Sequence, residues 1–302
     1  MGFSLLAFAE SRGVGALDAD GELKKIFAIQ QSGRVDEAIL RYTQMIAAKS
    51  SSAKAHTLRA LAYQQKGDDA RALADFNESI DLDPSQEVPY LYRGLLYDEK
   101  GLRDKALTDY TTAIALNPYS VAAYFNRAIS RQNGGQDRKA LEDYTQALRL
   151  DPRHDDAYYG RALAYKNLGE WDAAIADYTK SIQIAPSKVI AYFGRADVFE
   201  KKGRLDEAIA DLSKAIELDP SNVTAYNHRA DAYKYKADLV RALEDYDKAI
   251  EINPSDAETY NNRAFLYFIL KDYENSQKDS QKAEALGFKN PFRFWDFLMK
   301  VS

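Results

Sequence analysis

Two rows of charged side chains return through the sequence at a fixed interval of 34 residues. A row of arginines could bind phosphates or nucleic acid, whereas arginines matched one to one by aspartates form ion pairs between helices. In this chain each arginine is followed 16 residues later by an aspartate, which favours pairing. The arginines are Arg59, Arg93, Arg127, Arg161, Arg195, Arg229 and Arg263, and the aspartates are Asp75, Asp109, Asp143, Asp177, Asp211, Asp245 and Asp279.

Helical geometry predicts where the two rows lie. At about 100° per residue, the arginine and the aspartate are offset by the same angle from the apolar stripes of two successive helices. Equal offsets fall on the same side of an antiparallel pair, so we expect each arginine to meet an aspartate within its repeat or in a neighbouring one. The pattern therefore predicts a structural ladder of ion pairs and not a track for phosphates.

Residues with the chemistry of an active site do not form recognisable sets. His56, His154 and His228 are scattered along the chain, and there is no cysteine. We find no Ser/His/Asp grouping, no phosphate-binding glycine loop and no metal-ligand spacing. The sequence therefore predicts a protein that is not an enzyme and that has no cofactor and no metal site.

The charged rows belong to a 34-residue repeat that predicts pairs of helices. Within each copy, large and small apolar residues recur at the spacing of one helix face; in most copies a glycine then ends the first helix, and a proline ends the second. A period of this length indicates stacked repeats rather than a closed domain. The prolines that mark the period are Pro84, Pro118, Pro152, Pro186, Pro220 and Pro254.

The pattern resembles the tetratricopeptide repeat, in the form with Tyr-x-x-Arg-Ala and Asp-Tyr signatures typical of bacterial proteins. The resemblance covers residues 19–290, with copies that begin near residues 19, 53, 87, 121, 155, 189, 223 and 257. It implies an all-α, right-handed superhelical solenoid of about eight antiparallel helix pairs, with the first helices lining a concave groove. The copies depart from the pattern at Arg131, which replaces an aromatic residue, and at Ala237 and Lys271, which replace the turn glycine.

The resemblance also implies where a ligand binds, on first-helix positions at which the copies differ. Apolar side chains there would anchor a peptide or partner protein, and amides or charges would fix its backbone. The alternative is that some of these residues pack against the next repeat. The expected groove residues are Leu91, Phe125, Asn126, Tyr159, Phe193, Asp197, Asn227, Asp231 and Asn261.

One known kind of partner is not expected. Co-chaperones with similar repeats hold a C-terminal carboxylate with Lys and Asn on one first helix, Asn on the next, and Lys and Arg on the third. Asn126-Arg127 and Asn262-Arg263 match only the middle element. The Lys/Asn pair is missing from the preceding copies, so the sequence argues against a carboxylate clamp for chaperone tails.

Composition limits the remaining partners. The chain of 302 residues has a net charge of −5 with both signs interspersed, which argues against nucleic acid. No stretch approaches the ~20 apolar residues of a membrane span, so we do not expect an integral membrane protein. Residues 1–18 precede the repeats, and their apolar start, Met1–Ala9, fits either the end of a signal peptide or a short helix. The protein is expected to be soluble and cytoplasmic, or periplasmic or secreted if the signal-peptide interpretation holds.

Residues 291–302 are expected to form an apolar capping helix. A terminal cap should have a polar outer face, but this segment has apolar residues on both sides. It therefore predicts a second contact, either a homodimer or closure against the groove, unless the cap simply buries both sides. The residues concerned are Phe292, Phe294, Trp295, Phe297 and Leu298.

These observations predict a non-catalytic scaffold or adaptor that binds a peptide segment or a partner protein in its concave groove. One alternative is a regulatory or recruiting subunit of an enzyme complex. Another is a structural scaffold that assembles with itself through the C-terminal helix.

Overall fold

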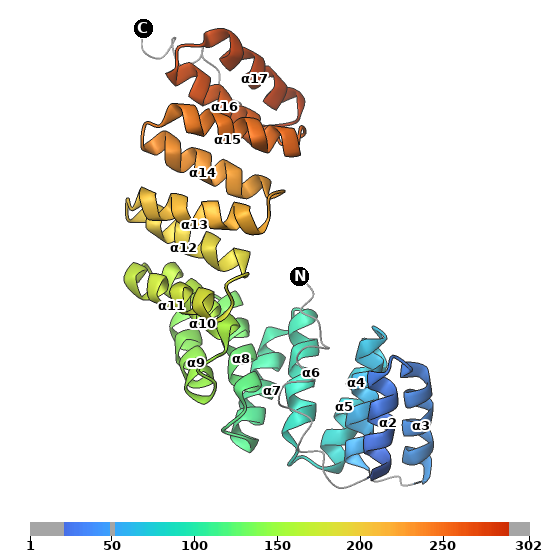
Figure 1. Cartoon of the computed structure of the whole chain (residues 1–302). Coiled ribbons are helices and arrows are strands. Elements are labelled where there is room, and N and C mark those ends of the chain that lie inside the picture. The colour runs from blue at the N-terminus through green and yellow to red at the C-terminus, as the bar shows by residue number, and fades with distance from the viewer. Residues whose placement is uncertain (1–20, 49–51, 290–302) are drawn as a thin grey trace. The chain divides into compact units, whose positions relative to one another are not determined.

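A computed structural model of the chain describes residues 21–48 and 52–289, which form sixteen α-helices and contain no strand. The predicted all-α solenoid of about eight antiparallel helix pairs is confirmed (Figure 1). The pairs are α2 (Gly21–Gln31) with α3 (Val35–Ala48), α4 (Ala53–Gln65) with α5 (Asp69–Leu82), α6 (Glu87–Glu99) with α7 (Arg103–Leu116), α8 (Val121–Asn133) with α9 (Asp137–Leu150), α10 (Asp155–Asn167) with α11 (Trp171–Ile184), α12 (Val189–Lys201) with α13 (Leu205–Leu218), α14 (Val223–Tyr235) with α15 (Leu239–Ile252), and α16 (Ala257–Ile269) with α17 (Tyr273–Ala285).

Two sequence predictions concern segments outside the described residues. They are the apolar N-terminal segment 1–18 and the capping helix 291–302, with its proposed contacts Phe292, Phe294, Trp295, Phe297 and Leu298. Both stay predictions.

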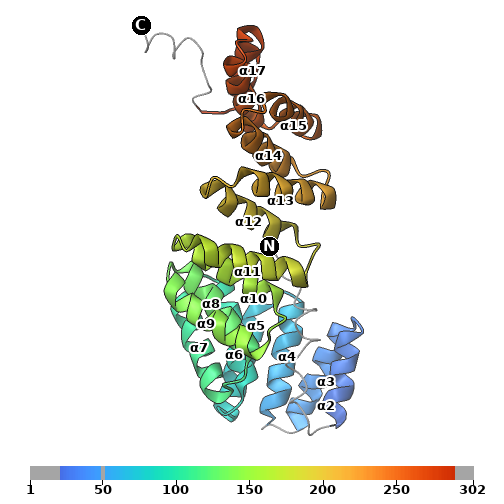
Figure 2. The same ribbon diagram turned by 60° about the vertical axis from the view of Figure 1, so that its left-hand side comes forward.

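The chain divides into two compact units, Met1–Pro152 and Arg153–Ser302. The N-terminal unit contains helices α2–α9 and the C-terminal unit contains helices α10–α17. Within each unit, a helix packs most extensively on the other member of its pair and next on the adjacent pair (Figures 1 and 2). This nearest-neighbour packing is the defining property of a solenoid.

The turn inside each pair requires one residue with a positive φ. Gly101, between α6 and α7, has φ 72°, and the following N–H, from Leu102, donates to the Tyr97 carbonyl at 2.8 Å. This arrangement satisfies a carbonyl at the end of the first helix. Ala237 and Lys271 adopt the same conformation, with φ 59° and 61°, although a Cβ makes it costly.

In six of the eight described pairs, the second helix ends because a proline follows. Asn117, directly before Pro118, has an extended backbone with φ −135° and ψ 92°. A proline ring disfavours helical geometry in the residue before it, so the chain leaves the helix at this point. The next first helix then begins at a side-chain cap, as where Ser120 accepts a hydrogen bond from the Ala123 N–H.

The core of each described pair from α4–α5 to α14–α15 joins one large second-helix residue to small residues on the first helix; Ser280 takes the large residue's place in α17. Tyr110 on α7 is fully buried, and a Cβ added to Gly94 on α6 would lie 2.8 Å from its ring. The corresponding tyrosines Tyr42, Tyr144, Tyr178 and Tyr246 are equally buried. The small residues on one face of such a first helix therefore pack against the second helix, and other faces of the first helix are available for other contacts.

Candidate functional site

The arginine and aspartate rows meet within each helix pair from α4–α5 to α16–α17. The arginine Nε and one Nη donate to the two carboxylate oxygens of the aspartate, at 2.6–2.9 Å. The aspartate side chains are only 3–8% exposed. The pairs are Arg59–Asp75, Arg93–Asp109, Arg127–Asp143, Arg161–Asp177, Arg195–Asp211, Arg229–Asp245 and Arg263–Asp279.

The same arginines also reach the preceding helix pair, which the sequence analysis missed. In the C-terminal unit, Nη1 of Arg195 donates to Thr179 Oγ1 at 2.8 Å, and Nη1 of Arg229 donates to Ser213 Oγ at 2.9 Å. The available signal was a polar residue 16 positions before each of these arginines. Further examples are Arg59 to Thr43, Arg93 to Asn77, Arg127 to Thr111 and Arg263 to Asp247. These bonds support a structural role for the ladder.

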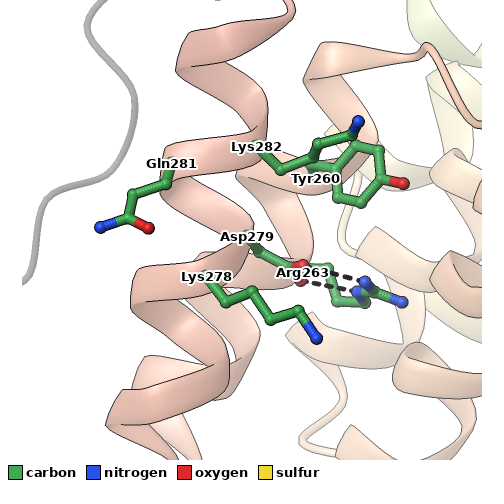
Figure 3. Close-up of a pocket in the computed structure, with 6 residues that line it drawn as sticks. All are labelled: Tyr260, Arg263, Lys278, Asp279, Gln281 and Lys282. Carbon is green, nitrogen blue, oxygen red and sulfur yellow. Dashed lines mark hydrogen bonds and ion pairs between the residues drawn. The ribbon is translucent and has the colours of Figure 1, made fainter.

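A depression of about 510 Å³ lies beside the last ladder pair (Figure 3). The Arg263–Asp279 ion pair lies among Tyr260 on α16 and three polar residues on α17, which are Lys278, Gln281 and Lys282. Gln281 on α17 stands where earlier repeats place the residue that meets the next arginine of the ladder. The depression therefore has the chemistry of a repeat edge, with the Arg263–Asp279 ion pair at its centre.

The N-terminal unit offers little groove surface at the expected positions. Leu91 on α6 and Phe125 on α8 are only 7% and 8% exposed, because both pack into the core. The Phe125 ring lies 6.0 Å from the Tyr144 ring of the same pair. The half-buried Asn126 donates from Nδ2 to the Ala122 carbonyl of its own helix at 2.9 Å. These residues therefore follow the packing alternative more closely than the binding one.

The C-terminal unit contains a hollow of about 360 Å³ on the first helices of three consecutive pairs. Tyr159 on α10, and Phe193 and Asp197 on α12, are expected groove residues that the structure brings together in it. Tyr159 and Phe193 are half-buried, so part of each ring remains accessible. The other lining residues are Leu163, Lys166, Tyr178, Ile190, Gly194, Ala196, Glu200, Leu212, Thr224 and His228. We call this feature the α10–α14 hollow.

Aromatic rings form much of the wall of the α10–α14 hollow. The Tyr159 ring lies 5.7 Å from the Tyr178 ring, and the Phe193 ring meets the His228 ring edge-on at 6.3 Å. Lys188 places its Nζ 5.2 Å above the Tyr159 ring. Ile190, which is half exposed, adds an apolar edge. These groups can take up apolar or cationic side chains.

The polar residues expected in the groove already have protein partners. Asp197 accepts from Lys166 Nζ at 3.0 Å and faces Lys201 Nζ at 3.5 Å. Asp231 accepts from the Tyr246 hydroxyl at 2.7 Å and pairs with Lys234.

Two further polar residues from the expected groove lie nearby on α14 and α16. Asn227 donates from Nδ2 to Thr259 Oγ1 at 2.6 Å, and Asn261 is half-buried on α16. Neither residue lines the α10–α14 hollow. Asn227 therefore joins neighbouring repeats. Contact with the next repeat was the alternative to ligand binding at the expected groove positions.

Two polar atoms in the α10–α14 hollow have no partner in the described structure. They are the Tyr178 hydroxyl and Glu200 Oε1, both buried without a hydrogen bond. Burial, reinforced by the neighbouring Asp197 and Asp231, raises the pKa of Glu200 to about 7. Burial also raises the pKa of Tyr178 far above its usual range. Sequence reasoning missed both residues, because each occupies an ordinary position of the repeat.

Among the described helices, none is both long and apolar enough to cross a membrane. The described residues also hold no cluster of histidine and carboxylate side chains suited to a metal ion.

Family models of one kind match most of the repeats. A model described as a TPR repeat matches residues 132–169, 197–236 and 238–270. Models described as the tetratricopeptide repeat match residues 30–87, 155–188 and 257–286. Together the matches cover more than half of the chain. No curated protein matches it significantly.

Solved structures with the same fold include the C-terminal part of a TPR repeat-containing protein from Cytophaga hutchinsonii. It has a TM-score of 0.66 and 19% identity, covering 79% of this chain and 98% of that one. A tetratricopeptide repeat protein from Parabacteroides merdae has a TM-score of 0.60 and 24% identity, with coverages of 83% and 97%. MamA has a TM-score of 0.51 and 29% identity, with coverages of 52% and 92%.

Proposed function

The chain belongs to the tetratricopeptide repeat family, and from this premise we propose that it is a non-catalytic scaffold that holds a peptide segment of a partner protein in the α10–α14 hollow. Proteins of this family generally mediate protein–protein interactions. The observation that carries the proposal is a hollow whose walls come from three successive first helices. Such a site extends along the repeats, which suits an extended or helical segment.

The chemistry of the hollow supports a peptide ligand. Half-buried rings at Tyr159 and Phe193 offer anchor points, and aromatic residues in partly desolvated pockets commonly dominate binding energy. Apolar side chains at Leu163 and Ile190 extend the contact surface. The residues at the equivalent positions of the N-terminal unit, Leu91 and Phe125, are buried, so the proposal concerns the C-terminal unit alone.

The test is capture of partners from a lysate of the source organism by the immobilised full chain. A Tyr159→Ala/Phe193→Ala variant should lose the captured partner, while circular dichroism shows unchanged helix content. Tyr235→Ala is the matched control, because it removes an exposed aromatic ring of the same unit that does not line the hollow. Capture that survives the double substitution would contradict the proposal.

A further inference from the structure

The two unpartnered atoms of the α10–α14 hollow arise from a broken repeat rule. In three repeats of the N-terminal unit, the buried second-helix tyrosine donates its hydroxyl to a residue 12 positions earlier on the first helix. This bond joins Tyr42 to Gln30 at 3.3 Å, Tyr110 to Asp98 at 3.0 Å and Tyr144 to Gln132 at 2.9 Å. The bond is absent from α4–α5, where Phe76 replaces the tyrosine and leaves Gln64 Oε1 unpartnered. In the C-terminal unit, it is absent from α10–α11 and α12–α13, two consecutive repeats that both contribute to the hollow.

Each of these two repeats has lost a different half of the bond. Lys166 stands where Tyr178 needs an acceptor, and Leu212 stands where Glu200 needs a tyrosine donor. The hydroxyl of Tyr178 is therefore an unpartnered polar group on a side chain with 0% exposure, and it lines the hollow. Buried polar groups almost always have a partner. Two of the four unpartnered atoms among the described residues lie in the lining of this one hollow, where a ligand could supply the missing hydrogen bonds.

Tyr246 shows that a lysine at this position need not leave the hydroxyl unpartnered. Lys234 stands 12 residues before Tyr246, as Lys166 does before Tyr178. The Tyr246 hydroxyl instead donates at 2.7 Å to Asp231, which lies one turn before Lys234 on α14. The equivalent residue for Tyr178 is Leu163, which has no polar atom to offer.

Gly194 on α12 lets the Tyr178 side chain pack directly against its backbone. A Cβ added to Gly194 would lie 2.5 Å from the Tyr178 ring and 2.9 Å from its hydroxyl oxygen. The absence of a side chain at Gly194 therefore allows the Tyr178 ring, with its hydroxyl, to lie against α12 in the lining of the α10–α14 hollow.

The distribution of charges indicates which ligand would complete the site. Asp197 and Asp231 are each engaged by lysines, whereas Glu200 has no ion-pair partner among the described residues. A carboxylate without a counter-ion in a desolvated site favours a cation. Tyr159 and Phe193 offer ring faces of the kind over which cations bind.

We propose that the α10–α14 hollow binds a basic side chain, preferentially arginine, of the partner segment. This inference rests on the proposed peptide-binding function and specifies its ligand. The guanidinium donates one N–H to Glu200 Oε1 and another to the Tyr178 hydroxyl oxygen, with its plane against the Tyr159 or Phe193 ring. Arginine suits the site better than lysine, because its planar group has several donors in a fixed geometry and stacks on aromatic rings.

Four pools of capped, fluorescent nonapeptides test the proposal on the full chain. The central residue is arginine, lysine, glutamine or glutamate, and the other positions are randomised. We expect the arginine pool to bind at least about tenfold more tightly than the glutamine pool, the size of one charged hydrogen bond. Glu200→Gln should remove most of this preference, and Tyr178→Phe should reduce it. Glu170→Gln, an exposed carboxylate of the same unit, should leave it unchanged.

The other outcomes separate this inference from the proposed function. Equal binding of all four pools, or a preference that persists in Glu200→Gln, would overturn the basic-residue site and leave the peptide-binding groove standing. Tighter binding of the glutamate pool would overturn it as well. Binding of no pool would also overturn it, and the groove function itself is then decided by whether lysate capture depends on Tyr159 and Phe193.

Discussion

Arg195 holds Asp211 with two hydrogen bonds, from Nε at 2.8 Å and from Nη2 at 2.7 Å. Its remaining nitrogen, Nη1, donates to Thr179 of the preceding pair at 2.8 Å. One side chain therefore joins three helices, because it closes its own pair and fixes that pair against its neighbour. The repetition of this contact explains how polar residues can set the register of a stacked array.

We predict that Arg195→Ala lowers the free energy of unfolding by about 3 kcal/mol, because it leaves Asp211 buried without its counter-ion. The loss should be local, since each repeat contacts only its neighbours. Hydrogen exchange of the full chain should therefore show faster exchange in α12 and α13 first. Unchanged exchange together with lost partner binding would mean that the ladder serves binding.

Arg127→Ala offers a matched comparison in the N-terminal unit. Asp143 retains a second cation there, because Arg131 Nη1 lies 2.7 Å from it. We expect Arg127→Ala to cost less than Arg195→Ala, by about 1–2 kcal/mol, since the carboxylate stays paired. If the two variants lost equal local protection against hydrogen exchange, the second cation beside Asp143 would not reduce the destabilisation.

Removing a hydroxyl should have opposite consequences at two equivalent tyrosines. Tyr110 and Tyr178 are both fully buried, but only the Tyr110 hydroxyl has a partner, Asp98 at 3.0 Å. We predict that Tyr110→Phe costs about 1 kcal/mol, whereas Tyr178→Phe is neutral or slightly stabilising in the free protein. Thermal midpoints measured by circular dichroism would check this, and an equal loss at both sites would contradict the absence of a partner at Tyr178.

Most of the fold could be predicted from the sequence because one local pattern is repeated. The 34-residue period is visible by comparing copies, and the turn residue and the proline that follows most second helices are visible within a copy. Even the exceptions were identifiable, since Ala237 and Lys271 break the glycine pattern and the structure gives both a positive φ. A repeat array needs little long-range information, because each helix packs on sequence neighbours.

The candidate site was predicted less well because its features depend on pairs of residues. Phe125 and Tyr159 occupy the same repeat position, yet one is buried and the other half-buried. The unpartnered hydroxyl of Tyr178 follows only from comparing it with Lys166 in the same repeat. A list of residues at groove positions cannot show such missing partners, whereas comparison of hydrogen-bonded positions across repeats can.

Ala237→Gly should stabilise the protein, because Ala237 has φ 59° in a turn where other repeats place glycine. A Cβ in this left-handed conformation costs roughly 1–2 kcal/mol, which exceeds the ~0.4–1 kcal/mol that the greater entropy of glycine in the unfolded chain costs. We expect a gain of about 0.5–1 kcal/mol, measured as a higher denaturant midpoint at unchanged m-value. Ala225→Gly, within helix α14, is the control and should be destabilising.

The pKa of Glu200 makes stability depend on pH in a defined direction. Burial, with Asp197 and Asp231 nearby, raises this pKa from 4.5 to about 7, and only Lys201 opposes the shift. Folding therefore favours the protonated carboxyl. Its contribution to stability is fully present below pH 4.5, is lost as the pH rises to about 7, and stays lost above that value.

We predict that wild type loses stability relative to Glu200→Gln between pH 5 and about pH 7, since glutamine does not titrate. The side chain is partly exposed, so solvent screening limits the change to the order of 1 kcal/mol. His228 and Lys166 also line the hollow, so the comparison is repeated in His228→Gln and Lys166→Met backgrounds. A stability difference that stays constant across this range would show that folding does not raise the pKa of Glu200.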